Sequence, residues 1–322
     1  MSSVKKGVIL LNLGGPDRLE AVQPFLYNLF SDRDIIKLGP SFLQRPLALL
    51  ISLLRSKKSK GAYRLIGGFS PLKVITSAQA DALRDRLKQK GYPVYIGMRY
   101  WHPFIEETIK KIKTHGITHL LAIPLYPHYS IATSGSALNY LKRCLTGSGI
   151  FFKSINSWPD NPYYIKALRE NIKKALEQLK EPERSHIIFS AHSLPVSFIE
   201  KGDPYVKELM TTIKEVMKEL TLPWHLSYQS RSGPVKWLSP STEDKLKELS
   251  SRDIKEVILV PISFVSDHIE TLYEIDIYYR ESSEKLGLRL IRTESLNTAP
   301  LFIEALYDIV IKNMEDGSWQ RL

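Results

Sequence analysis

Short apolar runs alternate with longer segments of helical periodicity along most of the chain. In the first half, the apolar runs are rich in valine, isoleucine and leucine, a composition typical of strands that are buried on both faces. We predict strands at residues 8–13, 93–98, 117–125 and 151–155, and helices at 21–30, 77–90, 104–114 and 136–144. This alternation is typical of βαβ units that build a parallel sheet.

The second half repeats the same order of elements after a proline-containing stretch, residues 158–162. Its predicted strands are residues 186–190, 225–229, 256–263 and 289–293, and its predicted helices are 163–179, 205–220, 242–250 and 300–314. The repetition predicts an α/β fold of two similar Rossmann-like domains, each with a four-stranded parallel sheet flanked by helices, with an active-site cleft between them. We expect the domains at residues 1–157 and 158–322, with the last helix packing back across their junction.

One apolar stretch, residues 46–54, does not fit the strand pattern, and a basic segment follows it. It is far shorter than the ~20 apolar residues that a membrane-spanning helix needs. We interpret it either as a core helix or as an apolar lip that contacts a membrane surface or an apolar substrate. Arg55 and Tyr63 lie in the basic segment, which ends at the turn that contains Ser70. A run of charged residues is usually a solvated face of the protein. An apolar stretch followed by cations and an aromatic ring, however, is also suited to bind a flat apolar molecule with acidic groups.

Two histidines follow apolar runs in the second half, and open α/β sheets bind ligands beyond the carboxyl ends of their strands. His192 follows the run that begins at Ile187, and His268 follows the run that begins at Val257. A histidine in this position is more often a core or loop residue than a ligand. With an ordinary pKa near 6.5, however, each is also a candidate proton acceptor at neutral pH.

Three acidic residues beside His268 are spaced for one face of a helix. Asp267, Glu270 and Glu274 stand at i, i+3 and i+7, and the nearest downstream cation is Arg280. Because the like-charged Glu270 and Glu274 repel each other, a bound cation would stabilise this row of acidic residues. Asp267 and Glu270 also form a capping-box pattern at a helix start, which explains both residues without a ligand. Both interpretations stay open at this point.

The composition narrows the classes of function. The chain has 322 residues, 43% of them hydrophobic and 25% charged, which suits a globular protein of two domains. Its single cysteine, Cys144, excludes an intramolecular disulfide or a cysteine-bound cluster within one chain and favours a reducing, cytoplasmic location. The short apolar run near the N-terminus predicts a first strand rather than a signal peptide.

The formal net charge of +11 indicates anionic partners. No dense basic stripe or recognised nucleic-acid module accompanies it, so no nucleic-acid partner is predicted. The first predicted strand leads into Gly14, Gly15 and Pro16, which match neither the dinucleotide fingerprint nor a phosphate-binding loop. An acidic lipid surface or a substrate with acidic groups remains as the expected partner.

Motifs spread over nearly the whole chain resemble the ferrochelatase family. The matching stretches include LLNLGGP from Leu10, YRLIGGFSPL from Tyr63, FSAHSLP from Phe189, SYQSRSGPVKWLSPST from Ser227 and VPISFVSDHIETLYEID from Val260. The resemblance implies a lyase that inserts Fe²⁺ into a porphyrin with release of two protons, the last step of haem biosynthesis. Porphyrin and Fe²⁺ are then substrates, no cofactor is tightly bound, and we expect a monomer or homodimer.

The resemblance also implies roles for particular residues. It implies that His192 and Glu270 face each other across the cleft as catalytic and metal-binding residues. Asp267, His268 and Glu274 extend this row as a path for protons or metal. The residues implied to contact the porphyrin are Leu13, Arg55, Tyr63, Ser70, Trp237 and Phe264.

Two departures from the family pattern refine the prediction. Some members carry a C-terminal cysteine-rich extension that binds an iron–sulfur cluster; this chain has no such cysteines, so we expect no cluster. Leu13 stands where members that use coproporphyrin typically have tyrosine, so Leu13 and the apolar lip favour protoporphyrin IX. The alternatives are coproporphyrin III as substrate, a related chelatase that inserts Co²⁺ or Ni²⁺ into another tetrapyrrole, and a non-catalytic haem or metal-binding protein.

Overall fold

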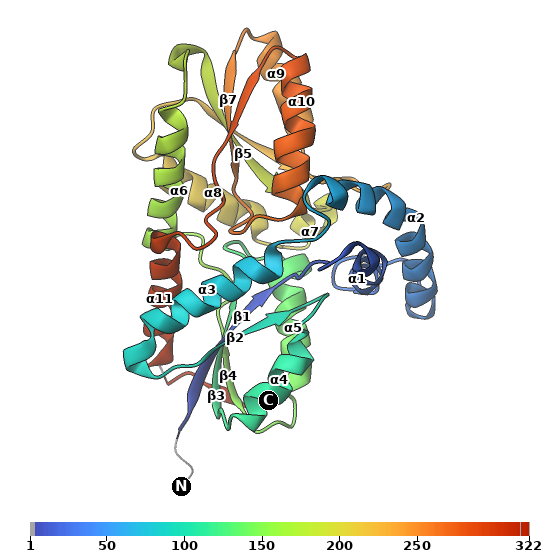
Figure 1. The fold of residues 1–322 in the computed structure, drawn as a ribbon, viewed down its shortest axis with the longest axis vertical. Helices are drawn as coiled ribbons and strands as arrows, with labels where there is room; N and C mark the ends of the chain where they lie inside the picture. The colour runs from blue at the N-terminus through green and yellow to red at the C-terminus, as the bar shows by residue number, and fades with distance from the viewer. Residues whose placement is uncertain (1–3, 316, 322) are drawn as a thin grey trace. The chain divides into compact units, whose positions relative to one another are not determined.

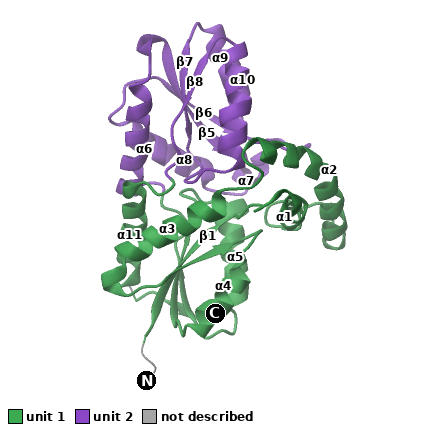
Figure 2. Ribbon diagram, viewed as in Figure 1, with its two compact units in different colours: residues 1–158, 297–322 green, residues 159–296 purple. Residues whose placement is uncertain are grey.

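The computed structural model describes residues 4–315 and 317–321 and divides the chain into two units. Unit 1 comprises residues 1–158 and 297–322, and unit 2 comprises residues 159–296 (Figure 2). The segment 297–322, which the sequence prediction placed in the second domain, belongs to unit 1. Its helix α11 (Pro300–Met314) packs against α3 (Leu72–Arg86) and β3 (His119–Pro124).

Unit 1 is built on a five-stranded sheet in the order β2-β1-β3-β4-β9 (Figure 1). Its strands are β1 (Lys6–Asn12), β2 (Val94–Met98), β3, β4 (Phe151–Ser154) and β9 (Gln320–Arg321). The first four run parallel, which confirms the parallel sheet expected from the alternating pattern. Strand β9 pairs antiparallel with β4 and was not predicted, because a strand of two residues leaves no periodic pattern.

The predicted helices of unit 1 begin and end within five residues of their predicted positions, with one exception. Their bounds are η1 (Leu19–Ala21), α1 (Val22–Phe30), η2 (Ser41–Leu43), α2 (Gln44–Leu65), η3 (Lys88–Lys90), α4 (Ile105–Thr114), the π-helix η4 (Ile131–Gly135) and α5 (Ser136–Leu145). The exception is α2, which continues through the basic segment because leucine, lysine, arginine and alanine favour helix. Helix α2 packs mainly on α1, and Figure 2 shows this pair to one side of the unit 1 sheet.

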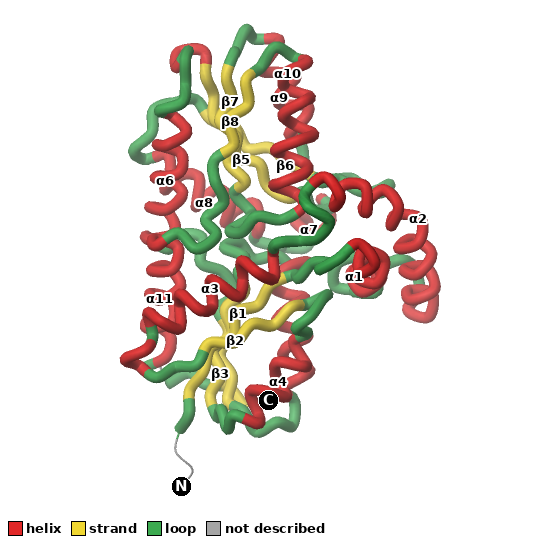
Figure 3. Tube along the Cα trace, viewed as in Figure 1, coloured by secondary structure: helices red, strands yellow, loops and turns green. Residues whose placement is uncertain are grey.

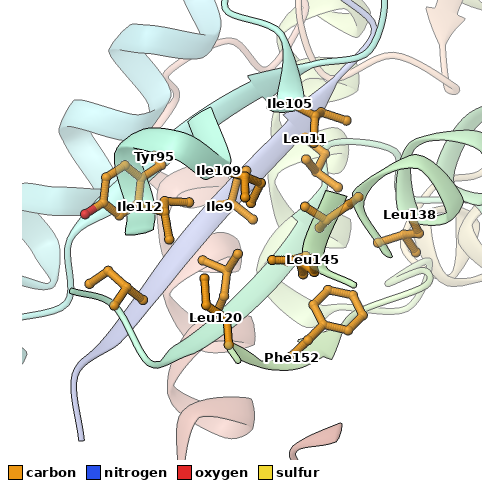
Figure 4. Packing of buried hydrophobic residues seen from close by; sticks show 14 of the residues in the cluster. Ile9, Leu11, Tyr95, Ile105, Ile109, Ile112, Leu120, Leu138, Leu145 and Phe152 are labelled. Carbon is orange, nitrogen blue, oxygen red and sulfur yellow. The ribbon is translucent and has the colours of Figure 1, made fainter. Parts of the chain in front are cut away.

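The core of unit 1 follows from the alternation of side chains along β1. Ile9 and Leu11 lie in one cluster with apolar side chains of α4 and α5 (Figure 4). Val8 and Leu10, whose side chains point to the opposite face, are also fully buried. Because helices cover both faces of the sheet, β1 reads as a continuous apolar run.

Unit 2 has the predicted four-stranded parallel sheet, and its strand order is β6-β5-β7-β8 (Figure 3). The elements of unit 2 are α6 (Pro162–Leu176), η5 (Pro182–Arg184), β5 (Ser185–His192), α7 (Val196–Glu200), α8 (Tyr205–Met217), β6 (Trp224–Gln229), α9 (Thr242–Ser251), β7 (Glu256–Pro261), the π-helix η6 (Glu270–Tyr279), α10 (Arg280–Lys285) and β8 (Arg289–Arg292). Ile188 of β5 and Leu259 of β7 pack with apolar side chains of α9 and η6. The two central strands, β5 and β7, are thus packed against apolar side chains of α9 and η6.

Candidate active site

His192 is the last residue of β5, and its backbone is held by two side chains from other elements. The hydroxyl of Tyr205 donates to the His192 carbonyl oxygen at 3.0 Å. The hydroxyl oxygen of Ser263 accepts the His192 N–H at 3.1 Å and lies 2.6 Å from the Tyr205 hydroxyl. Since both polar backbone groups of His192 are bound, the strand end holds its imidazole in a defined place. The sequence did not point to Tyr205 or Ser263, which contact His192 only through the fold.

The His192 side chain forms a hydrogen bond with Glu270, the first residue of η6. The Nδ1 atom of His192 lies 2.8 Å from Oε2 of Glu270, and the two side chains are 35% and 22% exposed. A carboxylate beside Nδ1 favours the proton on that nitrogen. The Nε2 atom of His192 is then a free acceptor when the ring is neutral.

The pKa values of these two groups move in opposite directions. Burial alone lowers the pKa of His192, but the charge of Glu270 and the hydrogen bond to it outweigh burial and raise the pKa above its ordinary 6.5. Burial alone raises the pKa of Glu270, but the adjacent His192 and the Ser230 hydrogen bond lower it below its ordinary 4.5. The site therefore stabilises an imidazolium next to a carboxylate.

Glu274 lies in the same polar cluster and behaves differently. Its Oε1 accepts hydrogen bonds from the Ser230 N–H at 2.9 Å and from the Tyr279 hydroxyl at 3.0 Å. Burial and the neighbouring charge of Glu270 raise the pKa of Glu274. Glu270 and Glu274 are thus a pair of carboxyl groups whose environments drive their pKa values apart, an arrangement common in acid–base sites.

Asp267 does have a basic partner, which corrects the expectation that no cation answers the acidic row. Arg292 at the end of β8 contacts Asp267 at 3.2 Å and Asp276 at 2.7 Å. Sequence distance hid this pairing, because Arg292 comes from the neighbouring parallel strand. At the start of this helix the Thr271 hydroxyl oxygen accepts the His268 N–H at 3.0 Å.

The acidic helix itself differs from the expected α-helix. Residues 270–279 form a π-helix, a geometry that is rare and often found at functional sites. Glu270 and Glu274 still converge on one residue, Ser230, which follows β6. Asp267 precedes the helix and is bound by Arg292 and Ser295.

His268 and Phe264 lie in the loop between β7 and η6. His268 is buried, and its Nδ1 donates to the Ser266 carbonyl oxygen at 3.1 Å. Burial lowers the pKa of His268, so the ring is neutral at physiological pH. The Phe264 ring lies with its centre 4.3 Å from that of His268 and 6.3 Å from that of His192, and so joins the two histidines.

Trp237 belongs to a loop that runs beside the segment after His192. Its backbone bridges to Pro195, and its indole N–H donates to the Gly233 carbonyl oxygen at 3.4 Å. The Leu238 N–H also donates to the Leu194 carbonyl oxygen at 3.0 Å. The aromatic ring is therefore anchored next to the loop that leaves the end of β5.

The other predicted porphyrin contacts lie in unit 1. Leu13 directly follows β1, and its carbonyl oxygen accepts the Tyr100 N–H at 2.9 Å. Ser70 is buried, and its N–H donates to the Pro16 carbonyl oxygen at 2.8 Å. A Cβ atom on Gly15 would lie 2.4 Å from the Ser70 hydroxyl oxygen, so only glycine permits this close approach.

Arg55 and Tyr63 both lie on α2 but differ in exposure. Arg55 is exposed, with its guanidinium 5.4 Å from the centre of the Phe30 ring. Tyr63 is 5% exposed, and its carbonyl oxygen accepts the Gly68 N–H at the turn that leads to Ser70. Arg55 is thus presented to the surface, whereas the Tyr63 ring is part of the packing of α2.

The sequence matches one protein family along most of its length. The model of the family described as ferrochelatase matches residues 5–314. A curated ferrochelatase from Synechococcus elongatus is 52% identical over 319 residues, covering 96% of this chain and 82% of the relative. A ferrochelatase from Geotalea daltonii is 48% identical over 312 residues, covering 96% of this chain and 98% of the relative.

Solved structures with a similar fold include those of SirB and CbiX. SirB from Bacillus subtilis with Fe³⁺ has a TM-score of 0.59 at 11% identity, covering 96% of this chain and 95% of that chain. CbiX, described as the terminal enzyme for biosynthesis of sirohaem in denitrifying bacteria, has a TM-score of 0.55 at 10% identity, covering 95% and 99%. At such low identities the likeness shows the fold alone.

Proposed function

Because this chain belongs to the ferrochelatase family, we propose that it is a lyase that inserts Fe²⁺ into protoporphyrin IX and forms protohaem. Ferrochelatase is the metal-insertion enzyme of haem synthesis and acts on a porphyrin and a metal ion. The observation that carries the proposed chemistry is the 2.8 Å contact between His192 and Glu270 at the end of a central strand.

Metal insertion sets two requirements that the site must meet. The porphyrin loses two pyrrole protons, and the metal ion loses part of its water shell before it reaches the ring nitrogens. A flat macrocycle resists both steps, because its nitrogen lone pairs lie in the plane of the ring. A binding pocket with rigid walls that holds the ring puckered lowers this barrier through binding energy spent elsewhere on the molecule.

We assign the proton-accepting role to His192. Its Nδ1 is occupied by Glu270, which leaves Nε2 to take the two pyrrole protons one at a time, each released along the proposed proton path before the next is accepted. The nearby carboxylate of Glu270 stabilises the imidazolium that forms, in agreement with the raised pKa of His192. The firm backbone contacts of His192 with Tyr205 and Ser263 support a fixed direction for this transfer.

The incoming Fe²⁺ needs ligands that bind it weakly enough to release it. A carboxylate oxygen of Glu270 and, before it takes up a proton, the Nε2 atom of His192 both suit a divalent first-row metal, and two such ligands leave most positions for water or the ring. Asp267, His268 and Glu274 extend from this pair as the proposed path for protons or metal. The raised pKa of Glu274 suits a group that takes up and releases protons.

The porphyrin itself needs apolar walls and cations for its propionates. We propose that Leu13, Trp237 and Phe264 contact the ring and that the exposed Arg55 contacts a propionate. Tyr63 and Ser70 are buried, so we propose that they shape the unit 1 part of the porphyrin site rather than bind a charge.

Protoporphyrin IX should be metallated faster than coproporphyrin III. Coproporphyrin carries two further propionates, and neither Leu13 nor the exposed leucines of α2 (Leu50, Leu53 and Leu54) can solvate them. The expected preference for protoporphyrin IX in kcat/KM is therefore about tenfold or more. The measurement is anaerobic insertion of Fe²⁺ into both rings in parallel, followed by loss of the free-base absorption spectrum.

The two other outcomes of that comparison have distinct meanings. A preference for coproporphyrin III keeps the enzyme class and overturns the proposed substrate. Insertion into neither ring, with binding of porphyrin retained, favours a haem or metal-binding protein without catalysis.

The exposed apolar row on and before α2 supports a further proposal, contact with a membrane that contains anionic lipids. Phe42, Leu50, Leu53 and Leu54 are 76%, 53%, 55% and 72% exposed. Lysines and arginines follow them along α2, and cations beside an apolar surface favour binding to anionic lipids. Within the described part of the chain, no helix has both the length and the apolarity to cross a bilayer.

The triple variant Leu50→Ser, Leu53→Ser, Leu54→Ser should lose most binding to vesicles of phosphatidylglycerol and phosphatidylcholine. Each leucine in the interface contributes apolar burial of about 1.5–3 kcal/mol, so the expected loss is at least tenfold. Co-sedimentation measures it. Val235→Ser, at a residue of unit 2 that is 50% exposed, is the control and should bind normally. Equal binding by the triple variant and the parent protein contradicts the proposal.

A further inference from the structure

Ser230 contacts both glutamates of η6, and the roles proposed above leave it unused. Its N–H donates to Oε1 of Glu274 at 2.9 Å. Its hydroxyl oxygen lies 2.8 Å from Oε2 of Glu270 and in short contact with Oε2 of Glu274. A side chain at the end of β6 thus bridges two carboxyl groups on the neighbouring helix.

The bridge matters because the two carboxyl groups do not attract each other. Acidic groups four residues apart on a helix repel when charged and drift to separate positions unless something holds them. Gln229 offers only longer contacts, at 3.3 Å to the Glu270 carbonyl oxygen and 3.4 Å to Oε2 of Glu274. The Oε2 atom of Glu270 that Ser230 contacts is the same atom that lies beside His192.

The backbone of Ser230 is part of the same arrangement. Its φ angle is +64°, in the left-handed region that residues other than glycine rarely adopt. This bend at the end of β6 directs both the N–H and the hydroxyl of Ser230 toward η6. A costly backbone conformation that is combined with two polar contacts at a site indicates a functional constraint.

We propose that Ser230 is a positioning residue whose hydroxyl donates to the Glu270 carboxylate and holds it against His192, while the Ser230 N–H holds Glu274. The proposal rests on the roles of His192 and Glu270 proposed above. Ser230 acts through Glu270 and is assigned no contact with the porphyrin or the metal ion.

Three variants separate the hydroxyl from the backbone. Ser230→Ala and Ser230→Gly both remove the hydroxyl, but glycine also relieves the positive φ angle. Ser230→Thr keeps the hydroxyl, but its β-branched side chain strains this backbone further. We therefore expect kcat for Fe²⁺ insertion to fall on the order of tenfold to a hundredfold in the alanine and glycine variants and to stay near the parent value in the threonine variant.

Thermal unfolding should rank the same variants differently. The glycine variant should melt at or above the temperature of the alanine variant, and the threonine variant should melt below the parent protein. The KM for porphyrin should stay within about twofold in all three, since the change is confined to the placement of Glu270. Ser251→Ala, an exposed serine at the end of α9, is the control and should leave kcat unchanged.

The outcomes distinguish this inference from the proposed function. Full kcat in the alanine and glycine variants, or a kcat that simply follows melting temperature across the series, overturns the role of Ser230 while iron insertion by the parent protein still stands. A parent protein that inserts no iron overturns the proposed function and this inference with it.

Discussion

His192→Ala should abolish metal insertion and leave porphyrin binding nearly intact. The alanine removes the proposed proton acceptor at the end of β5 but no wall of the ring pocket, so kcat should fall about 10²–10⁴-fold. Anaerobic assays with Fe²⁺ and protoporphyrin IX measure kcat, and a fluorescence titration with the metal-free ring measures binding.

His186→Ala provides the matched control for this prediction. His186 lies near the other end of the same strand, where its Nδ1 is 2.8 Å from Nε2 of His225. Its loss should leave kcat within about twofold, since it touches no group of the proposed site. Near-normal turnover by the His192 variant would remove that residue from the mechanism, and a collapse of porphyrin binding would assign it to ring packing.

Glu270→Gln should lower the maximal rate by about 10²–10³-fold and move the acidic limb of the kcat/KM profile to lower pH. The glutamine keeps the shape of the side chain but removes the charge that raises the pKa of His192. Burial then dominates and lowers this pKa, with the more distant Glu274 as the remaining acidic neighbour. A neutral imidazole persists to lower pH, but the imidazolium product has lost its partner. An unchanged profile contradicts the pairing.

The same variant also tests the ion pair between His192 and Glu270 through the pH dependence of the melting temperature. A raised pKa of His192 stabilises the folded state fully below 6.5, and this contribution is lost as pH rises through the raised value. A lowered pKa of Glu270 stabilises the folded state above 4.5, and this contribution is lost as pH falls. The difference in melting temperature between the parent protein and the variant should therefore be largest between pH 4.5 and 6.5, and smaller at pH 9. A constant difference across this range argues against an ion pair.

The fold could be predicted from the sequence where burial alone determined the pattern of apolar residues. Strands β1 and β7 are buried on both faces, so each appears as a continuous apolar run that ends near its predicted position. The C-terminal segment was harder to assign, because the place of α11 in unit 1 is set by packing and not by any local pattern. The length of α2 was underestimated, since a basic stretch on an exposed face has no apolar periodicity to mark its end.

The site was readable only where residue type is itself informative. A histidine after a buried strand and a row of acids drew attention to His192 and Glu270, but their contact spans 78 positions and depends on how β5 and η6 pack. Ser230 and Tyr205 carry no such signal, because serine and tyrosine are common and their partners come from other elements. Arg292 was missed for the same reason, although it answers Asp267 directly.

Helix α2 packs on α1 outside the sheet, so its free energy of local opening should differ from that of the central strands. Strand β5 is hydrogen-bonded on both sides, by β6 and β7, so its amide hydrogens exchange with solvent only when much of unit 2 opens. Helix α2 takes no part in strand pairing, packs mainly on α1 and has an exposed outer face, so we expect it to open at a lower free energy than β5. The exposed leucines of α2 thus lie in a segment that can open without loss of strand pairing, whereas His192 ends a strand that is paired on both sides.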